Sequence, residues 1–330
     1  MKTLELLPLD RAFTWREAHA LGVTRRELKA HIEEALVRVL FRGVFIRYDV
    51  QLTVERRTQA LSLVLPNNAV ATDETAAWLH GVDLFRGMGE EGLPRLHFFQ
   101  AESNRRLRTD GVESGSRELA ITDVMRMGRI RVTTPLRTAL DLARLRRGPR
   151  ALAALDGLLR LGVFRVGDLE RELERFKGYR GIVQARLLVP LADERSDSVA
   201  ESCLRFEWLS ASNLPRPTPQ LPVHNPFSQY PWFLDLGVEE LKYAAEYDGI
   251  DFHSTPEQRD RDTQKRDYLT EEEGWTFDVF TKDKLFRPHS HPAGIIQAGI
   301  LEARRKLGLP AKEHRWPFAT DASRPWGVRI

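Results

Sequence analysis

Two helix-start motifs, ten residues apart, place the strongest constraint on how this chain can fold. The letters TWRE at 14–17 and TRRE at 24–27 each match a capping box, in which Thr caps the helix and Glu reaches back. Between them, LGV at 21–23 supplies a tight turn with a glycine that tolerates positive φ. The pattern predicts a short helix, a turn and a second helix over 25–34.

A β-hairpin is predicted directly after these helices, from two apolar-rich runs at 36–41 and 44–48 that flank Arg42-Gly43. Helix, turn, helix and hairpin form a winged helix, whose second helix enters the major groove while the hairpin lies over phosphates. A winged helix used only for protein contacts is the alternative. The cations on these elements favour duplex DNA, and the predicted DNA-binding residues are Arg25, Arg26, Lys29, Arg38, Arg42 and Arg47.

This N-terminal region also resembles a known family. Residues 11–85, including GVTRREL at 22–28 and RGVF at 42–45, look like the N-terminal domain of AbiEi-type antitoxins. In that family the domain binds DNA and often represses its own operon. The resemblance therefore implies a regulatory function for the winged helix.

The middle of the chain is interpreted as an α/β connector that adds arginine contacts to DNA. Strands are expected at 96–99 and 130–133, and helices after Thr134, at 151–161 and at 166–177. No group of residues in this region forms a catalytic constellation. The isolated ionisable side chains are interpreted as structural, capping or salt-bridging groups: His80, His97, Asp141 and Asp156.

Three carboxylates are predicted to share one patch near the C-terminus. After a Pro-rich passage, two strands at 232–238 and 241–248 are joined by a short acidic turn, which places Asp235 opposite Glu246. Asp248, two residues further on, shares a strand face with Glu246. Such carboxylates repel one another unless a cation joins them, and their hard oxygens suit Mg²⁺ or Mn²⁺. Solvated surface acids are the alternative to this metal site, whose predicted ligands are Asp235, Glu246 and Asp248.

The surrounding motifs resemble the Vsr-like endonuclease domains of the PD-(D/E)XK nuclease superfamily. The matching pieces are AES at 200–202, LPRP at 214–217, Asp235, AEYDG at 245–249, His253, RDYL at 266–269 and GW at 274–275. The resemblance implies that Asp235 and Glu246 are the core metal ligands, that Glu201 assists them and that His253 is the general acid or base. The implied catalytic set is Glu201, Asp235, Glu246, Asp248 and His253.

One position departs from the superfamily pattern, because Asp248 stands where a Lys is usual, two residues after the Glu. The cation that would stabilise charge or activate water is therefore unassigned by the motif. Arg259 and Lys265, on the helix expected to follow, are the candidates to replace it. The departure also leaves room for a domain that binds DNA without cutting it.

The charge distribution fits a polyanion-binding region attached to a cation site. Residues 95–150 hold 13 Arg against 6 acidic residues, whereas residues 235–283 hold 15 acidic and 6 basic residues. A single cysteine excludes an intrachain disulfide, and no apolar stretch approaches the ~20 residues that span a bilayer. We therefore expect a cytoplasmic protein with no membrane partner.

Together these patterns predict a mixed α/β (α+β) chain in four parts. They are a winged helix at 1–85, the connector at 86–195, a restriction-endonuclease-like mixed sheet flanked by helices at 196–310, and a tail at 311–330. The leading function is a Mg²⁺-dependent deoxyribonuclease (endonuclease) that acts on duplex DNA. The alternative is a non-catalytic DNA-binding regulator or antitoxin-like repressor with a degenerate nuclease fold. A homodimer is an expected assembly, and a toxin is the expected partner under the alternative.

Overall fold

The computed structural model of the 330-residue chain describes residues 3–66, 69–85, 95–100, 112–113, 117–211, 214–249 and 256–311. The chain divides into two compact units, one from residues 1–85 and 90–142 and the other from residue 143 onward. Three sheets, together with helices in both units, confirm the predicted mixed α/β class within the described residues. The four-part division made from the sequence is finer than these two units and stays a prediction.

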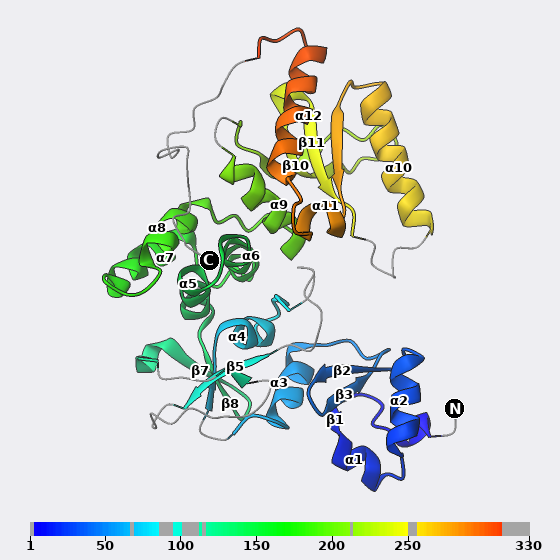
Figure 1. Ribbon diagram of the computed structural model, residues 1–330, viewed down its shortest axis with the longest axis vertical. Helices are drawn as coiled ribbons and strands as arrows, with labels where there is room; N and C mark the ends of the chain where they lie inside the picture. The colour runs from blue at the N-terminus through cyan, green and yellow to red at the C-terminus, as the bar shows by residue number, and fades with distance from the viewer. Residues whose placement is uncertain are drawn as a thin grey trace. The chain divides into compact units, whose positions relative to one another are not determined.

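The first unit begins with the predicted winged helix (Figure 1). A turn at Gly22, with φ of +91°, separates two helices, and a second turn at Gly43, with φ of +80°, joins the two strands of the wing. A short strand at the start of the domain pairs antiparallel with the second wing strand. The elements are η1 (Leu4–Leu6), β1 (Phe13–Thr14), α1 (Trp15–Ala20), α2 (Arg25–Glu33), β2 (Val37–Phe41) and β3 (Val44–Arg47).

Of the two predicted capping boxes, only the second is complete. Thr24 accepts a hydrogen bond from the Glu27 N–H, and the Glu27 carboxylate accepts one from the Thr24 N–H at 2.8 Å. Thr14 also caps its helix, but the Glu17 carboxylate pairs with Arg11 instead of reaching back. A guanidinium is a stronger partner for a carboxylate than a backbone N–H, which explains the difference.

The winged helix has a small core of its own. It contains Leu7, Phe13, Ala18, Val23, Leu28 and Val37. Leu21 also matches the apolar spacing of this core, but its side chain is 42% exposed because it caps the end of α1.

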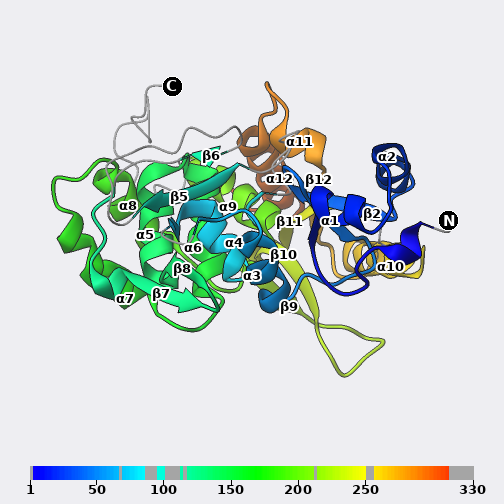
Figure 2. The same cartoon turned by 90° about the horizontal axis from the view of Figure 1, so that it is seen from below.

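A second sheet completes the first unit. Its strand order is β6-β5-β4-β8-β7, and the β7–β8 hairpin lies at one edge, as Figure 2 shows. The strands predicted at 96–99 and 130–133 are confirmed as β5 and β8. The elements are α3 (Val54–Ser62), β4 (Ala69–Ala71), α4 (Asp73–Leu79), β5 (Leu96–Gln100), β6 (Val112–Glu113), η2 (Ile121–Asp123), β7 (Val124–Met127) and β8 (Ile130–Thr133).

One hydrophobic cluster joins the wing to this second sheet, and we refer to it as the shared core. The ring of Phe41, in the wing, lies edge-on to that of Trp78 in α4, with centroids 5.0 Å apart. The wing hairpin and the second sheet are therefore packed as one body. The buried members are Ala12, Leu40, Phe41, Val44, Ile46, Val50, Ala60, Leu61, Ala69, Ala71, Ala76, Trp78, Leu79, Leu96, Phe98, Ile130 and Val132.

Helices dominate the start of the second unit, whose boundary falls within α5 (Pro135–Leu145). Asp156 and Arg205 form a fully buried ion pair at 2.6 Å that links α6 to α9, which confirms the salt-bridging role expected for Asp156. The elements are α6 (Gly148–Leu159), α7 (Val166–Glu172), η3 (Leu173–Phe176), α8 (Ile182–Leu188), η4 (Val189–Leu191) and α9 (Val199–Ser210). Every described helix of the chain is too short or too polar to cross a bilayer.

A four-stranded mixed sheet with order β12-β11-β10-β9 forms the rest of this unit. Strands β11 and β12 run parallel with α10 between them in sequence, which makes a strand–helix–strand unit. Helix α12 lies along β11 and β12 (Figure 1). The elements are β9 (Thr218–Val223), β10 (Trp232–Val238), η5 (Glu239–Leu241), β11 (Tyr243–Tyr247), α10 (Pro256–Glu271), β12 (Thr276–Phe280), α11 (Lys282–Phe286) and α12 (Pro292–Lys306).

Candidate functional sites

The winged helix exposes four of the six cations predicted to bind DNA. Arg25, Arg26 and Lys29 lie exposed on α2, and Arg42 lies exposed at the turn of the wing. The guanidinium of Arg25 lies over the Trp15 ring, 5.3 Å from its centre, which fixes the start of α2 against α1. These cations occupy the elements that face DNA in winged-helix proteins.

The other two predicted cations are engaged within the protein. Arg38 is half-buried and donates a hydrogen bond to the Val50 carbonyl at 2.6 Å. Arg47 pairs with Asp49 at 3.0 Å, and 18% of its side chain is exposed. Arg38 pairs across the strands with Ile46, and Arg47 pairs with Val37, so the two arginines brace the wing from opposite faces.

A second candidate site gathers three carboxylates from α9, β10 and β11, and we name Glu201, Asp235 and Glu246 the carboxylate cluster. Glu201 is held at the start of α9, where Ser198 caps the helix by accepting from the Glu201 N–H at 3.1 Å. The Glu201 carboxylate accepts hydrogen bonds from the Asp197 N–H and from the Gln220 amide, each at 2.9 Å. Gln220 lies in β9 with a φ of +48°, a left-handed conformation unusual for a residue with a side chain.

The other two carboxylates lie on adjacent strands. The pairing of Leu236 with Ala245 brings Asp235 to the end of β11, where its carboxylate accepts from the Tyr247 N–H at 2.7 Å. Glu246 is 6% exposed, and its carboxylate lies 2.5 Å from the Lys265 ammonium. Lys265, one of the two cations considered from the sequence, comes from α10, the helix that follows β11.

Burial perturbs two acids of this cluster, and repulsion between the carboxylates adds to the effect at Asp235. Burial raises the pKa of Asp235 to about 7, and the negative charges of Glu201 and Glu246 act in the same direction. The Tyr247 N–H and the Lys265 charge oppose that rise. Burial also raises the pKa of Glu201. Acids in such a state gain stability from a nearby positive charge, which is the property expected of a cation site.

Asp248, His253 and Arg259 are the remaining residues considered for this site. Asp248 directly follows the last residue of β11 and is exposed, and its predicted place beside Glu246 stays a prediction. His253, and the side chain of Arg259, lie outside the described residues. Among the side chains that the structure describes, no group of three His, Cys, Asp or Glu has the spacing of a metal site.

The donor chemistry of the cluster nevertheless suits one hard cation. Asp235 and Glu246 present carboxylate oxygens from neighbouring strands, and Mg²⁺ is commonly held by one or two carboxylates together with waters and phosphate oxygens. Those two side chains are the residues that would hold it. The Lys265 ammonium already neutralises part of the negative charge on Glu246.

A buried ion network in the first unit was not foreseen from the sequence. Arg117 binds Asp73 through two hydrogen bonds of 2.7 and 3.0 Å and also contacts Asp141 at 3.1 Å. Arg137 continues the network, with Asp141 at 2.8 Å and Asp123 at 2.5 Å. Asp73 adopts a φ of +51° at the start of α4, which sets its buried carboxylate toward Arg117. The salt-bridging role expected for Asp141 is confirmed.

The two middle histidines also have identifiable partners. His80 is buried, and its Nε2 lies 2.8 Å from the Thr133 carbonyl. His97 lies between Glu74 and Glu113, at 3.3 and 3.5 Å. The contact of His80 suits a packing role. His97 instead lies beside two carboxylates.

Comparison with known proteins finds a family that the middle of the chain resembles. Residues 68–191 match the family described as AbiEi antitoxin C-terminal domain. The antitoxin-type resemblance seen in the sequence is thus supported, but the match falls mainly on the region predicted to be a connector. It does not reach residues 196–290, whose resemblance to Vsr-like endonuclease domains stays a prediction. The chain thus has a winged helix followed by a region similar to the AbiEi antitoxin C-terminal domain.

The chain is 32% identical over 284 residues to two uncharacterized proteins of Mycobacterium tuberculosis, MT2308 of strain CDC 1551 / Oshkosh and Rv2248 of strain H37Rv. Each alignment covers 86% of this chain and 99% of the relative. The chain therefore belongs to the family of these proteins.

Proposed function

We propose that the protein is a DNA-binding regulator of the antitoxin type, in which the winged helix binds duplex DNA. The observation that carries this proposal is helix α2. A complete winged-helix core holds the helix in place while Arg25, Arg26 and Lys29 extend from it into solvent. The match of residues 68–191 to an antitoxin domain supports the regulatory role.

The protein would bind duplex DNA mainly through contacts to phosphates, and to a lesser extent through contacts to base edges. The start of α2 carries the positive end of the helix dipole, and the first-turn arginines add full charges beside it. Arg42 at the turn of the wing would contact the backbone of the neighbouring groove. Phosphate contacts of this kind fix the register of a protein on DNA, while base contacts set its sequence preference. A homodimer and a toxin partner remain predictions of this proposal.

The test is a binding measurement with the full chain. Fluorescence anisotropy would compare a duplex from upstream of its own coding region with a scrambled duplex of equal length, at two salt concentrations. Tighter binding to the upstream duplex supports a self-regulating repressor. Binding to neither duplex at low salt contradicts the proposal.

We also propose a second function, metal-dependent cleavage of DNA at the carboxylate cluster. One observation favours cleavage: the Lys265 ammonium lies against the Glu246 carboxylate, beside Asp235. A lysine therefore lies next to the carboxylate pair, although the sequence has Asp248 where the nuclease superfamily usually has its lysine. In that role Lys265 would stabilise negative charge on a scissile phosphate, and Gln220 would hold Glu201 in place. His253 is the proposed general acid or base.

A bound Mg²⁺ would polarise the phosphate and lower the pKa of water. The test is incubation of the full chain with supercoiled plasmid and Mg²⁺ or Mn²⁺, with and without chelator. Asp235→Asn, which removes charge and keeps shape, is expected to abolish nicking. Wild-type protein that binds duplex DNA but nicks no substrate leaves the regulator as the function. Nicking that persists in Asp235→Asn excludes the carboxylate cluster as its source.

A further inference from the structure

A row of four side chains crosses the second sheet on the face opposite the shared core. Val70 on β4 pairs with Phe99 on β5 and with Arg131 on β8, and Arg131 pairs in turn with Arg126 on β7. Cross-strand partners project from the same face of a sheet. The alternate residues of these strands, such as Ala71, belong to the shared core. The row therefore runs from an aromatic ring, through an aliphatic centre, to two guanidinium groups.

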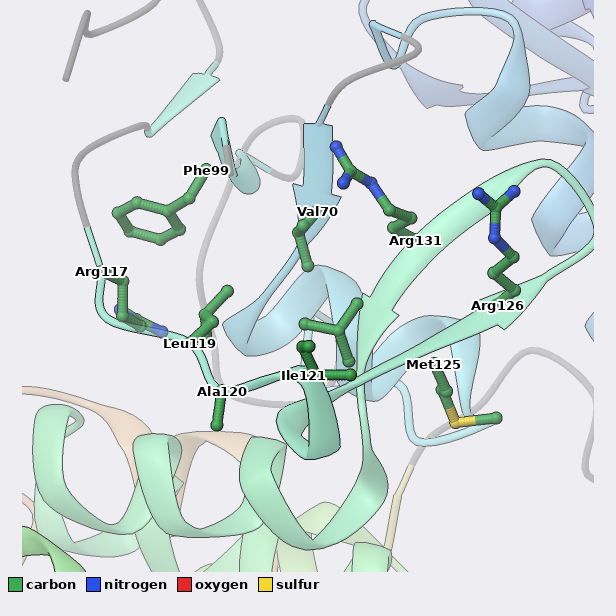
Figure 3. A pocket seen from close by; sticks show the side chains of 10 residues that line it. Val70, Phe99, Arg117, Leu119, Ala120, Ile121, Met125, Arg126 and Arg131 are labelled. Carbon is green, nitrogen blue, oxygen red and sulfur yellow. The ribbon is translucent and has the colours of Figure 1, made fainter. Parts of the chain in front are cut away.

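This row lines a pocket of about 350 Å³, the lower end of the size range of small-molecule sites. Figure 3 shows Arg126 and Arg131 side by side on neighbouring strands, with Phe99 beyond Val70. Residues 119–121 also line the pocket, and Ile121 is 95% exposed there. An isoleucine so exposed offers apolar surface that a ligand would cover.

The aromatic end of the pocket is held rigid by the buried ion network. Arg117 lies over the Phe99 ring, 4.5 Å from its centre, and the same guanidinium is bound to Asp73 and Asp141. The charge of Arg117 is thus balanced within the ion network, and at the pocket this side chain holds the Phe99 ring in place. A fixed ring lowers the entropy cost of stacking a planar ligand.

The opposite end of the pocket supplies positive charge. Arg126 and Arg131 come from adjacent strands, which lie about 4.8 Å apart in a sheet. Two arginine side chains on paired strands can both donate to the oxygens of one phosphate or carboxylate group. The pocket thus combines a site for a compact oxyanion with an apolar wall for a planar body.

We propose that this pocket binds a small ligand made of a planar aromatic body carrying one oxyanion, either a phosphate or a carboxylate. The oxyanion lies on Arg126 and Arg131, and the ring lies between Phe99 and Ile121. This site is independent of DNA binding and of cleavage, because its residues belong to neither the winged helix nor the carboxylate cluster.

The test is isothermal titration calorimetry of the full chain with four probes. They are 5′-AMP, which has the ring and a phosphate; 1-naphthoate, which has a ring and a carboxylate; adenosine, which lacks the anion; and inorganic phosphate, which lacks the ring. We expect saturable binding of 5′-AMP or 1-naphthoate, with the tighter of the two identifying the oxyanion. Adenosine and phosphate should each bind at least roughly tenfold more weakly, since each loses one half of the contacts.

Three variants locate the site. Arg131→Gln and Arg126→Gln should each weaken the binding probe by roughly tenfold or more, the loss of one charge-assisted contact. Ile121→Ser should weaken it too, and because Ile121 is almost fully exposed, this change leaves the core intact. Arg129→Gln is the matched control, since Arg129 is an exposed arginine in the same hairpin that does not line the pocket.

Each outcome decides the proposal. Tight binding by 5′-AMP or 1-naphthoate that falls in the pocket variants and not in Arg129→Gln supports it. Binding of neither probe overturns it, as does binding that the pocket variants leave unchanged. Inorganic phosphate that binds as tightly as the aromatic probes also overturns it, because the apolar wall would then contribute nothing.

Discussion

The Lys265 ammonium, carried by α10, lies 2.5 Å from the Glu246 carboxylate of β11 and also donates to the Phe233 carbonyl of β10 at 3.2 Å. One side chain thus ties a helix to two strands at the point where the carboxylate cluster gathers. The side chains of Lys265 and Glu246 are both largely buried, so removing either one would leave the other as an uncompensated buried charge.

If the cluster cleaves DNA, Lys265→Ala should lower the cleavage rate by about 100- to 1,000-fold, the usual effect of removing one donor that stabilises transition-state charge. Lys265→Arg, which keeps the charge, should retain part of the rate. The measurement is single-turnover nicking of plasmid in Mn²⁺. Lys282→Ala is the control, because Lys282 is an exposed lysine on α11. Equal rates in wild type and Lys265→Ala would exclude a catalytic role for this lysine.

The salt dependence of DNA binding should show whether the cations of α2 contact phosphates. Replacing Arg25, Arg26 and Lys29 together by Ala should weaken binding to duplex DNA and flatten the plot of log affinity against log salt. Each lost phosphate contact reduces the slope by about 0.9, because fewer counterions are released. The measurement is fluorescence anisotropy over a salt series.

A second triple variant controls for net charge. Arg304, Arg305 and Lys306 form the basic last turn of α12, in which Arg304 is partly buried and the other two are exposed, and their replacement by Ala removes the same number of charges. This variant should keep the wild-type slope. Equal slopes in all three proteins would place DNA binding elsewhere than on α2.

The winged helix could be predicted because its signals are local. Caps, turn glycines and apolar spacing act within a few residues, and the turns at Gly22 and Gly43 adopt the positive φ that the sequence implied. Strand β9 escaped prediction because Pro219 and Pro222 interrupt it. Its position at the sheet edge explains why it tolerates residues without an N–H donor.

The candidate sites could be predicted only in part, because they depend on contacts between distant segments. The sequence offered Arg259 and Lys265 as the missing cation, and the orientation of α10 places Lys265 against Glu246. Asp73 and Arg117, 44 positions apart, carry no periodic signal that would pair them.

The stability of the first unit should fall as the pH is lowered below about 6.5, the pKa of an unperturbed histidine. Burial lowers the pKa of His80 in the folded protein, and the contact with the Thr133 carbonyl only partly opposes it. The unfolded chain therefore binds a proton that the folded chain does not, at a cost of at most about 1.4 kcal/mol per pH unit. Hydrogen exchange of the α4 amides between pH 7 and 5 measures this loss.

A pair of histidine variants isolates this effect. His80→Asn should flatten the dependence of the unfolding free energy on pH, whatever it does to the absolute stability. His19→Asn, at an exposed position, should leave the pH dependence as in wild type. An unchanged pH dependence in His80→Asn would contradict the assignment.

Two glycines of α12 should respond in opposite directions to alanine. A Cβ at Gly299 would lie 2.0 Å from a carboxylate oxygen of Asp278 and 2.5 Å from the Tyr243 ring, so Gly299→Ala should destabilise the second unit by about 1–3 kcal/mol. A Cβ at Gly294 meets only the His291 side chain, at 3.8 Å, so Gly294→Ala should stabilise the helix by about 0.5–1 kcal/mol. Thermal unfolding followed by circular dichroism compares them, and a stabilised Gly299→Ala protein would contradict the packing described for α12.

The shared core determines how small a DNA-reading fragment of this protein can be. A fragment ending at residue 50 would contain both helices and the wing, yet it would leave Phe41 and Ile46 without the apolar surface that covers them. The partners of those side chains lie as far along the chain as Val132 in β8. Gene fusion or truncation therefore has to carry the first 142 residues together, and the winged helix cannot be exchanged between proteins as a free-standing part.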